Sequence, residues 1–252
     1  MSTYISATIQ DFSTKAFING SNKSVWQTMS KQIRTGELTI ISAPPAHGAS
    51  TAALCLGLAQ DTPYTFISTE NTKATIEFRM FGLMKGLSHT QLFGQQISSD
   101  ELTEEEKAKL IQNNIISDGV FSKDDVLAAI NIAKRQCPED PTLILDNVHR
   151  LDMSSGGIQI SSQKNAHNLR VLKELAYLHQ VKLIVIVPTA RSHSTNEKPT
   201  PADILYADRD RVSHKYIIVR RVYPTGADCE PETNLIMGQN RSGSVHYYEA
   251  VA

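Results

Sequence analysis

Two carboxylates in this sequence stand where they could act on a metal-bound phosphate. Asp146 ends the apolar run LILD and Glu70 ends the run TFISTE, and both runs are typical of buried strands. In a parallel sheet, ligands bind at the carboxyl ends of the strands, so we expect both side chains at one edge. Asp146 could hold Mg²⁺ through water, and Glu70 could orient an attacking water. The alternatives are that Asp146 merely caps a turn and that Glu70 caps a helix, where glutamate is uncommon.

The segment 43–51 has the shape of a phosphate-binding loop but lacks its main cation. Such a loop needs small residues whose backbone N–H groups turn inward, a helix beyond it, a lysine for the phosphates and a hydroxyl for Mg²⁺. Gly48 and the hydroxyls are present, whereas Ala49 stands at the lysine position. The candidate nucleotide-binding residues are Ala43, Pro44, Pro45, Ala46, His47, Gly48, Ala49, Ser50 and Thr51, and the candidate magnesium ligands are Ser50 and Asp146. Taken alone, the segment fits an ordinary strand–helix turn better.

Two arginines near predicted strand ends are weaker candidates. Arg241 lies in the turn GQNRSG between the last two strands, and Arg191 follows another strand in the segment TARS. A single arginine in a turn is usually solvated, so neither position indicates a site by itself.

The apolar pattern predicts an α/β fold in which strands alternate with helices around a mostly parallel sheet. Several of the runs are almost continuously apolar, as in strands covered on both faces. The predicted strands cover residues 38–43, 64–69, 142–147, 182–187, 215–222, 233–240 and 244–251. The predicted helices cover residues 51–60, 72–86, 101–113, 123–136 and 164–180. The last three strands have short connections, which favours antiparallel pairing at one edge.

Length and composition indicate one globular domain. The chain has 252 residues, a formal net charge of −1, 40% hydrophobic and 20% charged residues, which fits a single α/β domain with a full core. No apolar run approaches the roughly 20 residues that cross a bilayer, and the start has no secretory pattern. Three scattered cysteines without a CxxC pair fit a reducing compartment, so we expect a cytoplasmic protein with no membrane contact. The near-zero charge gives no general attraction to nucleic acid.

The order of these segments resembles the motor domain of the ring-shaped bacterial replicative helicases of the DnaB type, which have a RecA-like fold. The resemblance begins near Gly20 and extends to the C-terminus. The loop APPAHGAST is similar to the family's A-R-P-S-M-G-K-T, and STEN falls at S-L-E-M with its catalytic glutamate. LDNVHRLD matches the aspartate of I-D-Y-L-Q-L, the Walker B element, and IMGQNRSG is similar to I-I-I-G-K-Q-R-N-G. The resemblance implies that Glu70, Asp146 and Arg241 are catalytic positions, with Arg241 as an arginine finger toward a neighbouring subunit's nucleotide.

Three departures from this pattern bear on activity. Ala49 replaces the loop lysine, Pro188 falls at the glutamine that senses the γ-phosphate, and Gln239 replaces the lysine before the finger. Removing one preorganised donor from such a site costs roughly a hundred- to a thousandfold in kcat. Lys73 is a cation that could compensate, and His47 in the loop is a poorer substitute because a histidine is mostly neutral at pH 7. The resemblance implies ATP and Mg²⁺ as ligands, and the departures predict that they bind weakly or not at all, with little or no ATPase activity.

The resemblance also implies partners. In the family, the loops that correspond to residues 154–163 and 188–203 line a DNA channel. The candidate DNA-binding residues in these loops and at their edges are Lys164, Arg191, His193 and Lys198. The expected partners are a replicative helicase or another replication protein, single-stranded DNA, and further copies in an oligomer or ring. We expect residues 1–19 to form an N-terminal extension and residues 20–252 a single domain.

Three functions stay open at this point. The first is a helicase-like protein of DNA replication that is impaired in ATP hydrolysis and acts by binding a replicative helicase or single-stranded DNA. The second is an active ATP-dependent helicase or DNA-stimulated ATPase with an atypical phosphate loop, which rests on the retained Glu70, Asp146 and Arg241. The third is a protein-interaction module that uses no nucleotide. Hydrolysis, its dependence on Glu70, and the salt dependence of oligonucleotide binding separate the three.

Overall fold

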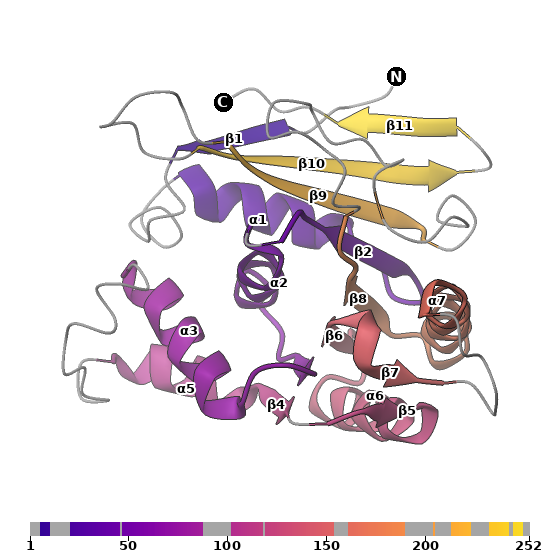
Figure 1. Cartoon of the computed structure of the whole chain (residues 1–252). Coiled ribbons are helices and arrows are strands. Elements are labelled where there is room, and N and C mark those ends of the chain that lie inside the picture. Colours follow the sequence, from indigo (N-terminus) through magenta and orange to yellow (C-terminus); the bar gives the residue numbers. More distant parts are fainter. Residues whose placement is uncertain are drawn as a thin grey trace.

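A computed structural model (Figure 1) describes residues 6–10, 21–45, 47–87, 102–117, 119–153, 161–189, 204, 213–222, 232–241 and 244–248. The strands are β1 (Ser6–Gln10), β2 (Leu38–Ser42), β3 (Thr65–Ser68), β4 (Asn114–Ser117), β5 (Phe121–Ser122), β6 (Thr142–Asp146), β7 (Leu151–Asp152), β8 (Lys182–Ile186), β9 (Lys215–Val222), β10 (Glu232–Arg241) and β11 (Ser244–Tyr248). The helices are α1 (Ser21–Gln32), α2 (Ala49–Leu58), α3 (Lys73–Lys85), α5 (Glu104–Gln112), α6 (Lys123–Gln136) and α7 (Ser161–His179), with the 3₁₀ turn η2 (Val148–Arg150).

The main sheet is parallel in its central part and antiparallel at one side. Its strands lie in the order β1-β10-β9-β2-β8-β6-β3-β4, and β11 also pairs with β10. Pairing is parallel from β9 across to β4. It is antiparallel where β10 meets β9, β1 and β11. The predicted α/β class and the antiparallel pairing of the last three strands are confirmed. β1, inside the segment expected as an N-terminal extension, pairs with β10 in this sheet.

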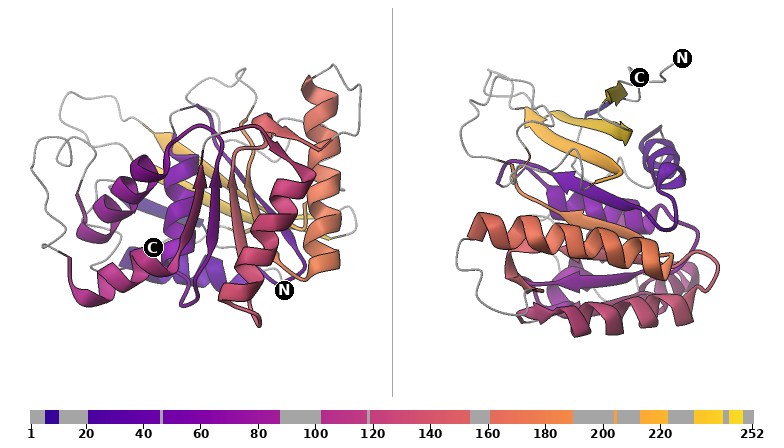
Figure 2. Two further views of the ribbon diagram at one scale, coloured as in Figure 1. Left: turned by 90° about the horizontal axis from the view of Figure 1, so that it is seen from below. Right: turned by 90° about the vertical axis from the view of Figure 1, so that its right-hand side faces the viewer.

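Helices cover both faces of the sheet (Figures 1 and 2). Helices α1, α2 and α3 contribute to the hydrophobic core on one face, and α6 and α7 contribute to the core on the other. Strands β2, β3 and β6 are buried along their whole length, which explains why their sequences are almost continuously apolar. None of the helices in the described ranges is long and apolar enough to cross a membrane.

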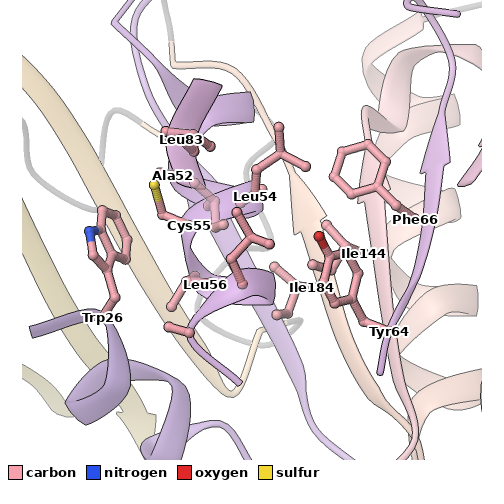
Figure 3. Packing of buried hydrophobic residues seen from close by; sticks show 14 of the residues in the cluster. Trp26, Ala52, Leu54, Cys55, Leu56, Tyr64, Phe66, Leu83, Ile144 and Ile184 are labelled. Atoms are coloured by element: carbon pink, nitrogen blue, oxygen red, sulfur yellow. The ribbon is translucent and has the colours of Figure 1, made fainter. Parts of the chain in front are cut away.

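Helix α2 approaches the sheet closely, and one glycine makes this approach fit. Figure 3 shows α2 between Trp26 on one side and Tyr64 and Phe66 on the other. A Cβ atom on Gly57 would lie 2.7 Å from Tyr64 Cζ and 3.0 Å from Ile144 Cδ1. Real Cβ atoms do not approach other atoms at the first of these distances, so the helix sits where only glycine fits.

Side-chain caps explain where helices α3, α5 and α6 begin. Thr103 and Ser122 form capping boxes with Glu106 and Asp125 at the starts of α5 and α6, which satisfy backbone N–H groups of the first turn. Helix α2 differs from the prediction, because it begins at Ala49 and not at residue 51. The cause is Gly48, whose left-handed backbone (φ 91°, ψ 27°) turns the chain directly into the helix.

Candidate nucleotide-binding site

Four strand ends lie side by side at one edge of the sheet, as the sequence predicts. Strands β2, β8, β6 and β3 are consecutive neighbours, and backbone hydrogen bonds continue past their paired residues. The Thr189 nitrogen donates to the Ala43 carbonyl at 3.1 Å, and the Thr69 nitrogen donates to the Asp146 carbonyl at 2.6 Å. The segment 43–51, Glu70 and Asp146 therefore emerge from the same edge, where parallel sheets bind ligands.

The loop between β2 and α2 leads into a helix start that no side chain caps. The His47 nitrogen donates to the Pro44 carbonyl at 3.1 Å, which makes a tight turn before Gly48. Gly48 is the N-cap residue of α2 and makes no side-chain cap bond. The first turn of α2 thus offers backbone N–H groups and the positive end of the helix dipole to a ligand.

Ala49 is the first residue of α2, and its methyl group packs partly against the hydrophobic core. Ser50 and Thr51 follow in the same turn and are partly exposed. The position that would carry the loop lysine therefore carries no charge and no hydrogen-bond donor beyond its backbone. Ala46 lies outside the described residues.

Asp146 is buried, with 5% of its surface exposed, and its Oδ2 atom has no hydrogen-bond partner among the described residues. Burial raises the pKa of this carboxyl above its usual value, and the negative charge of Glu70 raises it further. The nearby Ser50 hydroxyl and the positive charge of Arg79 oppose this rise in the pKa. Ser50 and Asp146 are thus close enough to interact, as expected of two ligands of one cation.

The alternative roles considered for the two carboxylates are not observed. The neighbour of Asp146, Asn147, caps the turn η2, because its Oδ1 atom accepts from the His149 nitrogen at 2.9 Å. Thr72 caps α3 by accepting from the Thr75 nitrogen at 3.3 Å, so Glu70 does not cap a helix. Glu70 is exposed and accepts a hydrogen bond from Asn147 Nδ2 at 3.0 Å.

Arg79 is a site residue that sequence reasoning missed. It lies on α3, two turns beyond Glu70, and its Nη2 atom donates to Asn71 Oδ1 at 3.3 Å. This bond holds the guanidinium beside Asn71, the residue after Glu70, and its positive charge lowers the pKa of Asp146. A lone arginine on the helix that follows Glu70 was the only available signal in the sequence. Lys73, the cation considered instead, pairs with Glu77 at 3.7 Å on the exposed surface of α3.

The other predicted residues are not brought into this group. Arg241 ends β10 and pairs with Ser244 of β11. Because β10 is antiparallel to β9 and Gln239 faces Lys215, where β9 begins, Arg241 lies at the opposite edge of the sheet from Asp146. Lys164 forms an ion pair with Asp152 at 3.4 Å. The remaining candidates lie outside the described residues, namely Arg191, His193 and Lys198.

The residues present fit a magnesium-bound phosphate, with fewer contacts than a complete phosphate loop makes. A hydroxyl and a carboxylate oxygen without a partner are the ligands that Mg²⁺ prefers, and Ser50 and Asp146 supply both. The uncapped start of α2 suits a phosphate group. Two prolines remove two N–H donors from the loop, and Ala49 supplies no cation. The site could therefore hold Mg²⁺ and phosphate without the lysine that usually bridges the terminal phosphates.

Comparison with solved structures identifies the fold. No family model and no curated protein sequence matches the chain. Among solved structures, one described as an ATPase domain matches with a TM-score of 0.68 and 16% identity, over 85% of this chain and 80% of that chain. A second solved structure, described as a DnaB-like replicative helicase and its interactions with primase, matches with a TM-score of 0.68 and 15% identity. The match covers 85% of this chain and 55% of that chain. The protein therefore has an α/β RecA-like fold of the kind found in the ATPase domains of DnaB-like replicative helicases.

Proposed function

We propose that this protein is a helicase-like RecA-fold protein of DNA replication that is impaired in ATP hydrolysis. It acts by binding a replicative helicase or single-stranded DNA. The fold it shares with helicase ATPase domains supports the setting in replication. The single observation that carries the impairment is the first turn of α2, where the Ala49 methyl stands in place of a cation and contacts the core.

The loss of one cation is large on the scale of catalysis. Phosphoryl transfer depends mainly on positioning and on neutralising the charge that develops on the phosphates. Losing one preorganised donor would take an enzyme from about 10 turnovers per second to about 0.1 to 0.01 per second. Gln239 and Pro188 replace two further polar positions of the helicase pattern, which lowers the expected rate again. Such a rate is too slow for a motor and leaves binding as the useful activity.

Nucleotide binding is a separate property that the site could retain. Ser50 and Asp146 would hold Mg²⁺, and the backbone N–H groups at the start of α2 would contact phosphate. In this role the chain would report the nucleotide state to a partner without consuming the nucleotide quickly. Further copies of the chain, in an oligomer or ring, would place Arg241 near a neighbour's site, because Arg241 lies away from Asp146 within one chain.

Binding to DNA or to a helicase tests this proposal directly. The purified chain is titrated against a labelled single-stranded oligonucleotide by fluorescence anisotropy, at several salt concentrations, and against a purified DnaB-type hexamer by analytical ultracentrifugation. We expect binding to at least one of them without ATP. Binding to DNA should weaken with salt, because phosphate contacts release counterions, and Arg191→Ala with Lys198→Ala should weaken it further. Binding to neither would contradict the proposal.

The second candidate function is an active DNA-stimulated ATPase with an atypical loop, and Arg79 is the observation in its favour. Its guanidinium charge acts on Asp146 and could neutralise phosphate charge from α3 in place of the loop. This function predicts measurable hydrolysis that Glu70→Gln abolishes. Equal inactivity of the wild type and Glu70→Gln would exclude it.

A further inference from the structure

The candidate water-orienting carboxylate is already engaged by a side chain from the neighbouring strand end. Asn147 Nδ2 donates to Glu70 Oε1 at 3.0 Å. The two residues are 77 positions apart in the sequence. Asn147 directly follows the end of β6, and Glu70 lies two residues after the end of β3. The contact therefore depends on the pairing of β3 with β6 and not on local sequence.

The orientation of the Asn147 amide is fixed by a second hydrogen bond. Its Oδ1 atom accepts from the His149 nitrogen at 2.9 Å, because Asn147 is the cap of η2. A backbone nitrogen can only donate, so the oxygen must face His149 and the NH₂ group must face Glu70. The NH₂ group can only donate as well, and it donates to a carboxylate oxygen of Glu70.

Backbone contacts hold both partners in place. The Asn147 nitrogen donates to Thr69 Oγ1 at 3.1 Å, and the Thr69 nitrogen donates to the Asp146 carbonyl at 2.6 Å. The Arg150 Nη1 atom donates to the Thr69 carbonyl at 3.1 Å. Thr69 is 1% exposed, so its own atoms in these bonds are shielded from water. Thr69, the residue before Glu70, is thus hydrogen-bonded to Asp146, Asn147 and Arg150.

We propose that Asn147 is a positioning residue that holds Glu70 toward the end of β6 and restrains it from acting as a base. This inference rests on the proposed function, because it assumes that the site takes a nucleoside triphosphate. It adds a cause of slow hydrolysis that is independent of Ala49.

The chemistry explains why this hydrogen bond would matter. In hydrolysis, the oxygen of water forms a bond to the γ-phosphorus, and the bond from that phosphorus to the bridging oxygen breaks as the nucleoside diphosphate leaves. The proton of the attacking water passes to a base. A carboxylate has about four lone-pair sites, so the bond from Asn147 does not occupy the whole group. It fixes the direction in which Glu70 points, toward the end of β6, and loss of Asn147 would let the carboxylate turn toward the attacking water.

The test uses a background in which the loop cation is restored, so that absence of the lysine does not hide the effect. The variants are Ala49→Lys alone and combined with Asn147→Ser, each in the full chain. Serine keeps an oxygen that can accept the His149 N–H and cap η2, but it is too short and has no NH₂ group to reach Glu70. We expect the double variant to hydrolyse ATP about tenfold faster, the scale of one hydrogen bond to a charged group. Equal rates in the two variants, including no hydrolysis in either, or a slower rate in the double variant, would overturn the inference.

Two readouts separate this role from a structural one. The gain should appear in kcat with KM unchanged, since Glu70 acts on water and not on bound nucleotide. Adding Glu70→Gln should abolish the gain. In the wild type without nucleotide, the side-chain NH₂ resonances of Asn147 should shift on Glu70→Ala and not on Glu77→Ala, and unchanged resonances would contradict the contact itself. Failure of the proposed function is distinct, because it would appear as fast turnover in the wild type.

Discussion

The backbone nitrogen of Thr69, directly after the last paired residue of β3, donates to the carbonyl oxygen of Asp146, the last paired residue of β6, at 2.6 Å. This one bond extends the parallel pairing past the sheet edge and fixes where Glu70 and Asp146 emerge. The relative position of the two carboxylates is therefore set by backbone geometry. Substitutions of either side chain should change the chemistry of the site without moving its frame.

The first prediction concerns the buried carboxyl of Asp146. Because burial raises its pKa in the folded protein, the folded chain holds this proton more tightly than the unfolded chain. The protonated carboxyl therefore stabilises the folded chain fully at pH values below the pKa of Asp146 in the unfolded chain. This stabilisation is lost as the pH rises through the pKa of Asp146 in the folded chain. Asp146→Asn stays neutral and should raise the free energy of unfolding near neutral pH by about 1 kcal/mol.

Urea unfolding of the wild type and Asp146→Asn, without Mg²⁺ or nucleotide, measures this difference between about pH 4 and about pH 8. Asp61→Asn is the control, because Asp61 is exposed and should leave the pH dependence unchanged. A loss of stability in Asp146→Asn at neutral pH would contradict the assignment of Asp146 as a buried carboxylate with an unpartnered oxygen.

The second prediction concerns Arg79. Its charge lowers the pKa of Asp146, so Arg79→Gln should raise that pKa and move the pH-dependent loss of stability toward higher pH. It should also weaken binding of ATP with Mg²⁺ by about tenfold, the scale of one charge-assisted contact. Isothermal titration calorimetry measures the affinity. Lys73→Gln removes a charge from the start of the same helix, where Lys73 pairs with Glu77, and should have no effect on either quantity.

The third prediction restores the missing cation. Ala49→Lys places an ammonium group at the first turn of α2, beside the backbone donors of the loop. It should tighten ATP binding and raise hydrolysis roughly a hundredfold. Ala49→Met is the matched control, because it has a long side chain at the same position without a charge. The rise in melting temperature with ATP and Mg²⁺ reports binding, and similar behaviour of both variants would show that the charge is not what the site lacks.

The fourth prediction concerns the fit of α2 against the sheet. Gly57→Ala would gain roughly 0.5 to 1 kcal/mol from helix propensity. It would lose about 1 to 3 kcal/mol through overpacking, because the new Cβ atom would lie 2.7 Å from Tyr64 Cζ. The loss is larger, so the free energy of unfolding should fall. Tyr64→Ala in the same chain removes the clash, and the two changes should then cost less than the sum of their separate effects.

Much of the fold follows from local patterns in the sequence. Strands β2, β3 and β6 are covered on both faces, so their burial appears directly as continuous apolar runs. Helix α6 begins at Lys123, directly after the capping residue Ser122, and ends at Gln136, so its predicted range of 123–136 is correct. Prediction missed β1, α1 and β4, and also the short elements β5, β7 and η2. Helix α1 buries Trp26 and Met29, a spacing that is present in the sequence, whereas β1 is a strand only through its distant pairing with β10.

The site was predictable only in part. Glu70 and Asp146 could be placed because each ends a recognisable strand, and parallel strands share one edge. The contact of Asn147 with Glu70 joins residues 77 positions apart, and no local pattern encodes it. The bond from Arg79 to Asn71 is local, but the sequence does not show which residue of α3 makes it. The position of Arg241 at the opposite edge follows from the direction of β10, which the sequence of that strand alone does not reveal.

Impaired hydrolysis by this RecA-fold chain can be measured as phosphate release in the presence of single-stranded DNA. The wild type and Glu70→Gln are compared at saturating ATP and Mg²⁺. We expect the wild type to turn over at or below about 0.1 per second, within about tenfold of Glu70→Gln. A wild-type rate near about 10 per second that Glu70→Gln abolishes would contradict this impairment.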